Sequence, residues 1–220
     1  IPNVVHVTAK TRCVSPLVKN HLQRWVFPNH SLYFHDDIAA YRLLNYAVKD
    51  ANGHELIRGL SKQLPCISSG AAMSDMWRYV LLYHYGGVYT DLDNAPGHKY
   101  DVEHISPETD SFYFVEQGGF MSQYYMVSSK HHPMLLYMLA SAIRKVYNKS
   151  FGNVMKNMPP QTTGPNAVKV GYILFIRAAG GTTRGYDPAG IYYGGTDTNL
   201  TKELSWFGKG PEEFDIATLG

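Results

Sequence analysis

The residues with the clearest chemical potential are two aspartates, Asp91 and Asp93, at the end of the stretch VYTDLD at 88–93. This stretch is typical of a β-strand, in which side chains two positions apart share a face, so both acids should point the same way while Leu92 faces the core. Their Cα atoms would lie about 6.6 Å apart. Two carboxylates this close repel each other, and burying them without a partner is costly. A bound cation would remove that cost.

A divalent metal ion suits this pair of acids. Mg²⁺ and Mn²⁺ prefer oxygen ligands, and an ion held by one or two carboxylates completes its shell with water and substrate phosphates. The pair therefore indicates a site for a diphosphate. The alternative is a solvated turn, because aspartate is common in turns and Asn94 and Pro96 follow closely.

A second pair of charges lies in the segment before the strand. The segment 69–85 has its apolar residues at helical spacing, which places Asp75 and Arg78, three positions apart, on one helical face. A routine surface ion pair is the alternative. Only Gly86 and Gly87 join this helix to the strand, so the end of the helix should pack beside the strand. The spacing leaves open whether the charged pair reaches the carboxyl end of the strand.

The apolar patterning along the chain alternates between strands and helices. Helix signals include Ser15 as an N-cap before Pro16, and Asp37 as a cap for the next helix. We expect strands at 1–9, 31–37, 88–93, 111–116, 124–129 and 190–194, and helices at 15–25, 38–51, 54–63, 69–85, 132–147 and 166–179. This alternation predicts an α/β sandwich with a mainly parallel sheet, in which ligands bind at the carboxyl ends of strands.

Length and composition narrow the function classes. The chain has 220 residues, of which 45% are hydrophobic, enough for a single domain spanning 1–220. Charged residues make up only 17% and the net charge is +2, which argues against nucleic acid or an anionic membrane as a partner. No apolar run approaches the roughly 20 residues that span a bilayer. The chain begins at Ile1 rather than Met, so a cytosolic protein, a lumenal protein with a removed leader or anchor, and a part of a larger protein all stay open.

The cysteines and a histidine pair give weaker signals. Cys13 and Cys66 have no C-x-x-C spacing and form neither a disulfide framework nor a thiolate zinc site, although one bridge between them stays open. His131 and His132 lack the spacing of two zinc ligands on a helix. We expect His132, just before Pro133, to precede or cap a helix.

The segment 74–93 supports a more specific hypothesis. Its sequence, SDMWRYVLLYHYGGVYTDLD, closely resembles the signature S-D-x-x-R-Y-x-x-L-x-x-x-G-G-x-Y-x-D-x-D of glycosyltransferase family 32. That family contains fungal initiating mannosyltransferases, and the large clostridial glucosylating toxins share the signature. Weaker similarities extend over most of the chain, at IPNVVHVTAK, SSKHHPMLLYML, TTGP and ELSW. The resemblance implies a GT-A nucleotide-sugar transferase.

The resemblance also implies roles for individual residues. Asp93 would bind the metal ion, Mn²⁺ or Mg²⁺, that bridges the donor diphosphate, and Asp91 would contact the ribose and a metal-bound water. Asp75 and Arg78 would form hydrogen bonds with hydroxyls of the donor sugar. The remaining implied positions are Val7, Thr8 and Ala9 around the nucleotide base, mostly through backbone groups, Ser205 and Trp206 over the diphosphate, and Glu203 as a further neighbour of the metal.

The predicted reaction moves a hexose from a UDP- or GDP-sugar to a hydroxyl group of a glycan or protein. Breaking the glycosyl–phosphate bond puts negative charge on the diphosphate and positive charge on the sugar ring. A divalent ion would neutralise the former, and a carboxylate such as Asp75 would stabilise the latter. Families with this signature retain the sugar configuration. If this chain instead inverts it, the reaction needs a general base, and Glu116 is the leading candidate.

Two other functions fit parts of the same pattern. A sugar-nucleotide or carbohydrate-binding module could use all four charged residues without turnover, and transfer or hydrolysis of the donor would distinguish it from an enzyme. A haloacid-dehalogenase-like phosphotransferase also carries D-x-D at the tip of a strand. That class places the motif near the start of the chain and needs a later lysine and acidic pair, whereas here the motif comes after ninety residues and no later Asp-Asp pair exists.

Overall fold

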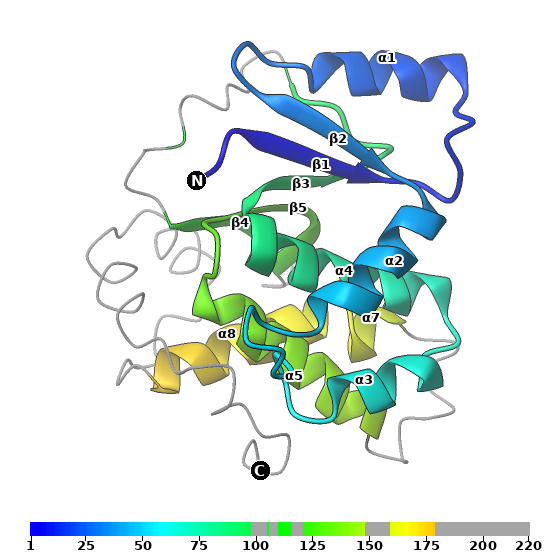
Figure 1. Cartoon of the computed structure of the whole chain (residues 1–220). Helices are drawn as coiled ribbons and strands as arrows, with labels where there is room; N and C mark the ends of the chain where they lie inside the picture. Colours follow the sequence, from blue (N-terminus) through cyan, green and yellow to red (C-terminus); the bar gives the residue numbers. More distant parts are fainter. Residues whose placement is uncertain (98–104, 106–109, 116–120, 148–158, 179–220) are drawn as a thin grey trace.

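The computed structural model describes residues 1–97, 105, 110–115, 121–147 and 159–178. They form a five-stranded sheet with helices on both faces (Figure 1). The strands are β1 (Val4–Thr8), β2 (Ser31–His35), β3 (Gly87–Asp91), β4 (Ser111–Val115) and β5 (Met121–Ser128), in the order β2-β1-β3-β5-β4. The expected strand at 190–194 lies outside the described residues.

Four of the five strands run in the same direction. β1 pairs in parallel with β2 and with β3, whereas β5 is antiparallel to both β3 and β4. β4 therefore points the same way as β1, β2 and β3, and only β5 is reversed. This arrangement confirms the predicted α/β sandwich of the GT-A type with a mainly parallel sheet.

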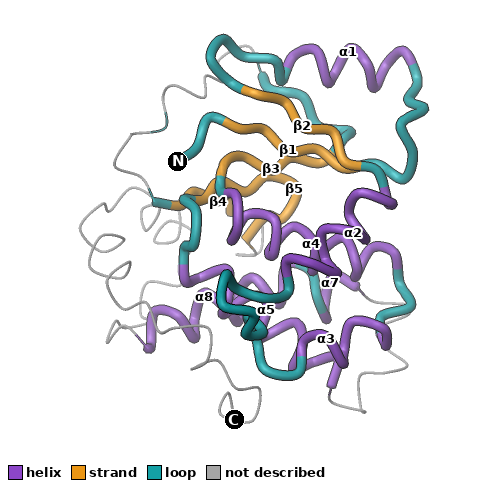
Figure 2. The backbone as a smooth tube through the Cα atoms, viewed as in Figure 1, coloured by secondary structure: helices purple, strands orange, loops and turns teal. Residues whose placement is uncertain are grey.

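The helices are distributed unevenly over the two faces (Figures 1 and 2). α1 lies on one side of the sheet, and α2, α4, α5 and α8 lie on the other. Their bounds are α1 (Pro16–Arg24), α2 (Asp37–Ala47), α3 (Leu60–Gln63), α4 (Gly70–Tyr85), α5 (Pro133–Tyr147), α7 (Pro159–Thr162) and α8 (Pro165–Ala178), with a 3-10 turn at Leu64–Cys66. No helix within the described residues is long and apolar enough to cross a membrane.

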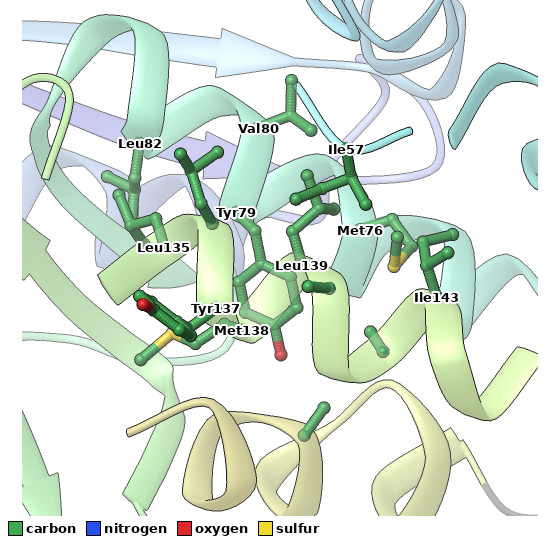
Figure 3. Packing of buried hydrophobic residues seen from close by; sticks show 14 of the residues in the cluster. Ile57, Met76, Tyr79, Val80, Leu82, Leu135, Tyr137, Met138, Leu139 and Ile143 are labelled. Carbon is green, nitrogen blue, oxygen red and sulfur yellow. The ribbon is translucent and has the colours of Figure 1, made fainter. Parts of the chain in front are cut away.

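Two hydrophobic clusters, one on each face, fix the sheet between the helix layers. The larger cluster joins α4, α5 and α8, and Figure 3 shows Met76 of α4 close to Leu139 and Ile143 of α5. Along β3, Val88 belongs to the smaller cluster and Tyr89 to the larger one. This alternation follows the two-residue period of a strand and turns every second side chain of β3 toward α4.

Glycines allow the sharp turn between α4 and β3. Ser69 caps the start of α4 by accepting from the N–H of Ala72, and Gly86 and Gly87 follow its end with φ angles of 63° and 94°. A Cβ atom on Gly87 would lie 2.5 Å from the carbonyl oxygen of Val4. The second glycine thus permits both the backbone conformation and the close approach of β1.

Several predicted boundaries are wrong. The strands expected at 1–9, 31–37 and 124–129 cover Val4–Thr8, Ser31–His35 and Met121–Ser128. The strand expected at 88–93 ends at Asp91, and the α2 helix begins with Asp36, not Asp37, as its cap, since the Asp36 carboxylate accepts from the N–H of Ala39 at 2.8 Å. The helix expected at 38–51 ends at Ala47 because the carboxylate of Asp50 accepts backbone N–H groups two and four residues ahead.

The helix expected at 54–63 is reduced to α3, which covers Leu60–Gln63. The Glu55 carboxylate accepts from the N–H groups of Gly59 and Ser61, and Gly59 has a φ of 83°. These side-chain acceptors hold the preceding residues in a turn, so the helix can start only after the glycine.

Candidate active site

The predicted site residues meet where two central strands end. Thr8 at the end of β1 pairs in register with Asp91 at the end of β3. From β1 the sheet extends to β2 on one side and to β3 on the other, which makes this edge a topological switch point. Ligands of open α/β sheets bind in the crevice outside such a point.

Helix α4 brings Asp75 and Arg78 to the same edge. The Arg78 guanidinium has Nη2 3.5 Å from Asp75 Oδ1 and Nη1 3.7 Å from Asp91 Oδ1. Asp75 and Arg78 are buried, whereas the side chain of Asp91 is 36% exposed. The charged pair on the helix therefore reaches the carboxyl end of the strand, which the sequence spacing alone did not decide.

Tyr89 links the strand acid to the helix cation. Its hydroxyl donates to Asp91 Oδ1 at 2.5 Å, and its ring lies under the guanidinium of Arg78, with 4.6 Å between the ring centroid and Cζ. Tyr89 and Asp91 are two residues apart on β3 and share the face toward α4. Together these contacts orient one carboxylate oxygen of Asp91.

A buried hydrogen-bond network holds the side chains of Asp75 and Arg78 in place. The Thr163 hydroxyl, between α7 and α8, donates to Asp75 Oδ2 at 2.7 Å, and the Thr163 carbonyl accepts from the Tyr79 hydroxyl at 2.6 Å. The backbone carbonyl of Gln123 on β5 accepts from Arg78 Nη1 at 2.8 Å, and the side-chain amide of Gln123 donates to the Tyr79 hydroxyl. Residues from α4, β5 and the α7–α8 turn thereby fix Asp75 and Arg78.

The environment of Asp75 opposes its charge. Burial raises the pKa of its carboxyl to about 6, and the nearby Asp91 raises it further, although Arg78 and the Thr163 hydrogen bond lower it. At neutral pH the group is largely ionised, yet it takes up a proton under mildly acidic conditions. A buried carboxyl with a perturbed pKa beside a cation is typical of functional sites.

Asp93 lies beyond the strand, in a turn closed by the hydrogen bond from the Asn94 N–H to the Asp91 carbonyl at 3.2 Å. The expected strand geometry, with both acids on one strand face, is therefore wrong. Leu92 packs against the smaller cluster, as predicted, and Asp93 is exposed.

The acids at this edge fit a divalent cation. Within the described part of the chain, Asp93 has no hydrogen-bond or ion-pair partner and Asp91 keeps Oδ2 free of any such contact. Both carboxylates are therefore available as oxygen ligands. No group of three acid, histidine or cysteine side chains that could hold a metal forms among the described residues. A cation would need ligands from the substrate or water to complete its shell.

The residues expected around the nucleotide base lie at the same edge. Val7 is fully buried, and both the Thr8 hydroxyl and the Ala9 N–H donate to the carbonyl of His35, at 3.2 and 3.0 Å. Glu116, Glu203, Ser205 and Trp206 lie outside the described residues.

Sequence reasoning did not assign roles to Tyr89, Gln123 and Thr163. Tyr89 had a usable signal, since it stands two positions before Asp91 and must share its strand face. Thr163 belongs to the stretch TTGP that contributes to the family resemblance, yet its contact with Asp75 spans 88 positions. Gln123 gave no signal, because its position beside Arg78 depends on the pairing of β5 with β3.

Comparison with known proteins agrees with this geometry. Residues 35–112 match the model of a family described as "Glycosyltransferase sugar-binding region containing DXD motif", and this range includes Asp75, Arg78, Asp91 and Asp93. These findings support a glycosyltransferase. No curated protein matches the sequence significantly.

The solved structure titled "PaToxG Glycosyltransferase" shares the fold. The two chains superpose with a TM-score of 0.54 at 14% sequence identity, over 94% of this chain and 78% of the other. At this identity the similarity concerns the arrangement of helices and strands, and the assignment of individual site residues depends on the contacts described above.

Proposed function

We propose that this chain is a single-domain, metal-dependent hexosyltransferase of the family 32 type. It would transfer a sugar from a UDP- or GDP-sugar to a hydroxyl group of a glycan or protein, with retention of configuration. The observation that supports this proposal is the contact chain from Asp75 through Arg78 to Asp91 at the switch point of the sheet. It combines a buried acid, a buried cation and a partly exposed acid where nucleotide ligands of α/β folds bind.

Asp91 and Asp93 would hold a Mn²⁺ or Mg²⁺ ion. When bound, such an ion neutralises the charge that develops on a leaving diphosphate. Tyr89 and Arg78 hold Asp91 in place, while the exposed Asp93 is accessible from solvent. Glu203 would lie near the ion, and Ser205 and Trp206 would cover the diphosphate.

Asp75 and Arg78 would bind hydroxyl groups of the donor sugar. The ionised carboxylate of Asp75 would also stabilise the positive charge that develops on the sugar ring. Both side chains are fixed by Thr163 and Gln123, so little reorganisation is needed when the charge develops. The backbone of Val7, Thr8 and Ala9 would contact the nucleotide base.

Retention needs no dedicated base, because the leaving phosphate can accept the proton of the acceptor hydroxyl. An inverting reaction would require a general base, for which Glu116 is the candidate. Analysis of the product anomer by NMR distinguishes the two outcomes, and an inverted product that depends on Glu116 would refute the retaining mechanism.

Calorimetry with UDP-, GDP- and dTDP-sugars, with and without Mn²⁺, tests the proposal directly. We expect one UDP- or GDP-sugar to bind more tightly with the ion, and donor hydrolysis to depend on it. Asp93→Asn should weaken ion-dependent donor binding by about tenfold or more, since a charged ligand is lost. Asp37→Asn at the start of α2 is the matched control.

Equal donor binding with and without Mn²⁺, or an unaffected Asp93→Asn variant, would contradict the metal-dependent proposal. Tight binding of a donor without hydrolysis or transfer to any acceptor would support the binding-module alternative.

A further inference from the structure

A cleft lies at the opposite edge of the sheet from Asp91. It has a volume of about 620 Å³ and opens where α4 ends at Tyr85 and β3 begins at Gly87. We call it the distal cleft and define it by Tyr46, Tyr83, His84, Tyr85, Lys130 and His131, with Lys49 and Asp50 on its wall. The length of β3 places it at least about 13 Å from Asp91.

Aromatic rings form one wall of the distal cleft. The ring of Tyr83 lies 5.2 Å from that of His131 and 5.4 Å from that of His84, and His84 is 6.4 Å from Tyr85. At the rim, Tyr46 is 83% exposed and Tyr85 is 52% exposed. Exposed rings beside polar groups suit the apolar faces of sugars, since tyrosine combines a flat apolar surface with a hydroxyl tip.

The charges of the distal cleft favour an anion. Lys49 and Lys130 contribute two ammonium groups, and Lys130 has no acidic partner within the described residues. Asp50, the only acid in the lining, already accepts from the N–H groups of Asn52 and His54, at 2.9 and 2.8 Å. The wall therefore presents net positive charge to a ligand.

The two histidines of the cleft are held in fixed positions. His84 Nε2 lies 2.6 Å from the carbonyl of Ala47, so this nitrogen carries the proton and Nδ1 remains an acceptor. His131 has a φ of 60°, and its N–H donates to the Tyr83 carbonyl at 2.7 Å. Such a left-handed conformation in a residue other than glycine is often retained at binding sites.

Both imidazoles are neutral near pH 7. Burial lowers the pKa of His84 and of His131, and the Lys130 ammonium lowers both further, whereas the hydrogen bond to the Ala47 carbonyl and the charge of Asp50 raise the pKa of His84. Lys130 and both rings line the same cleft. A ligand in the cleft thus meets neutral hydrogen-bonding rings and a cation together.

We propose that the distal cleft binds a sugar that carries an anionic group, such as a carboxylate or a phosphate, as a site separate from the candidate active site. The aromatic wall would contact the face of the sugar ring, His84 would accept from a hydroxyl, and Lys130 would bind the anionic group. This role goes beyond the proposed transfer reaction and does not depend on it.

Titration of the full chain with three sugars and one inorganic ion tests this proposal. The probes are a glucuronate-containing tetrasaccharide, glucose 6-phosphate, the uncharged cellotetraose and inorganic phosphate, followed by calorimetry and amide NMR. We expect an acidic sugar to bind at least about tenfold more tightly than cellotetraose and than phosphate, because both the ring and the charge contribute. The carboxylated and phosphorylated probes show which anionic group is preferred.

Two substitutions separate the contributions. Lys130→Gln should weaken binding of the acidic sugar by about tenfold and leave cellotetraose unchanged, whereas Tyr46→Ala should weaken both. Tyr41→Ala is the matched control, because Tyr41 is an exposed ring on the same helix outside the cleft lining. All three positions are exposed, and unchanged melting temperatures would show that the variants fold.

The proposal would be overturned if neither acidic sugar showed saturable binding, or if phosphate and glucose 6-phosphate bound with equal affinity. It would also be overturned if Lys130→Gln bound the acidic sugar as tightly as the original chain, or if the amide signals shifted at Asp91 instead of at the cleft. Competition by UDP or GDP would also place the sugar in the candidate active site. Donor binding by the Tyr46→Ala variant measures the proposed function separately, so either proposal can fail without the other.

Discussion

At the scale of single residues, the ionisation of Asp75 depends on a few contacts. Burial favours the protonated form, while Arg78 and the Thr163 hydroxyl favour the carboxylate, and the result is a pKa of about 6. The Thr163 hydrogen bond is the one contact among these that can be removed without introducing or deleting a charge. It therefore offers a direct test of whether Asp75 acts in its ionised form.

Thr163→Val should shift the pH dependence of donor hydrolysis. The valine keeps the shape of threonine but cannot donate to Asp75, so the pKa of Asp75 should rise by about one unit, the equivalent of a hydrogen bond to a charged group. The acidic limb of the activity profile would move to higher pH by the same amount. Initial rates between pH 5 and 8 measure this shift.

Thr163→Ser is the control, because serine retains the hydroxyl. Its activity profile should have the same acidic limb as that of the original chain. A profile that moves equally in both variants would indicate a packing effect at Thr163, and an unchanged profile in Thr163→Val would contradict a role for ionised Asp75.

The sequence predicted a candidate site with four charged residues but not the residues that support them. Asp75, Arg78, Asp91 and Asp93 lie within 19 consecutive positions, so local periodicity places them on one helix and one strand end. Thr163 reaches Asp75 only through the packing of α7 and α8 against α4. Local patterns hold no information on such long-range contacts.

At the scale of elements, the sequence predicted nearly every described strand and helix, and the two helices that were predicted too long, at 38–51 and 54–63, share one cause. Helices were expected to continue wherever apolar residues recur, but the carboxylates of Asp50 and Glu55 accept backbone N–H groups and stop them. Acidic side chains compete with helical hydrogen bonds only when the local backbone bends toward them. Periodicity alone does not reveal that bend.

The packing of α5 against α8 leads to a prediction at this scale. A Cβ atom on Gly171 of α8 would lie 2.6 Å from both the Cα and the backbone nitrogen of Met138 in α5. Gly171→Ala should therefore push the helices apart and lower the free energy of unfolding by about 1 to 3 kcal/mol, despite the better helix propensity of alanine. Urea unfolding followed by circular dichroism measures this change.

Gly70→Ala provides the matched comparison, since Gly70 begins α4 and a Cβ atom added to it would meet no other atom within 4 Å. This variant should be as stable as the original chain or slightly more stable. If Gly171→Ala behaved in the same way, the close approach of the two helices would be refuted.

At the scale of the whole molecule, buried titratable groups make stability depend on pH. His6 in β1 and His132 before α5 are buried, and burial lowers the pKa of each imidazole to about 4. His6 Nε2 lies 3.1 Å from the Gly86 carbonyl, and His132 Nδ1 accepts from the N–H of Met134. Both rings are therefore neutral parts of the folded structure at pH 7, and His132 contributes to the start of α5, as predicted.

As the pH falls, the two buried histidines and Asp75 change the free energy of unfolding in opposite directions. Between pH 6.5 and 4 the unfolded chain binds protons that folded His6 and His132 do not, so each residue removes up to about 3 kcal/mol of stability. The folded-state pKa of Asp75 is raised to about 6, so the folded chain binds a proton first and gains a similar amount over the same range. Together, these three groups should lower the free energy of unfolding by about 3 kcal/mol from pH 7 to pH 4.

Asp75→Asn should make the free energy of unfolding fall more steeply as the pH decreases. Asparagine does not titrate, so the compensating proton uptake disappears and the free energy of unfolding should fall by about 3 kcal/mol more between pH 7 and 4 than in the original chain. His132→Asn should make the dependence shallower by a similar amount, because the asparagine oxygen can still accept from the Met134 N–H while no longer binding a proton. Urea midpoints at pH 4, 5, 6 and 7 give both slopes, and parallel slopes for all three chains would show that these buried groups do not control the acid stability.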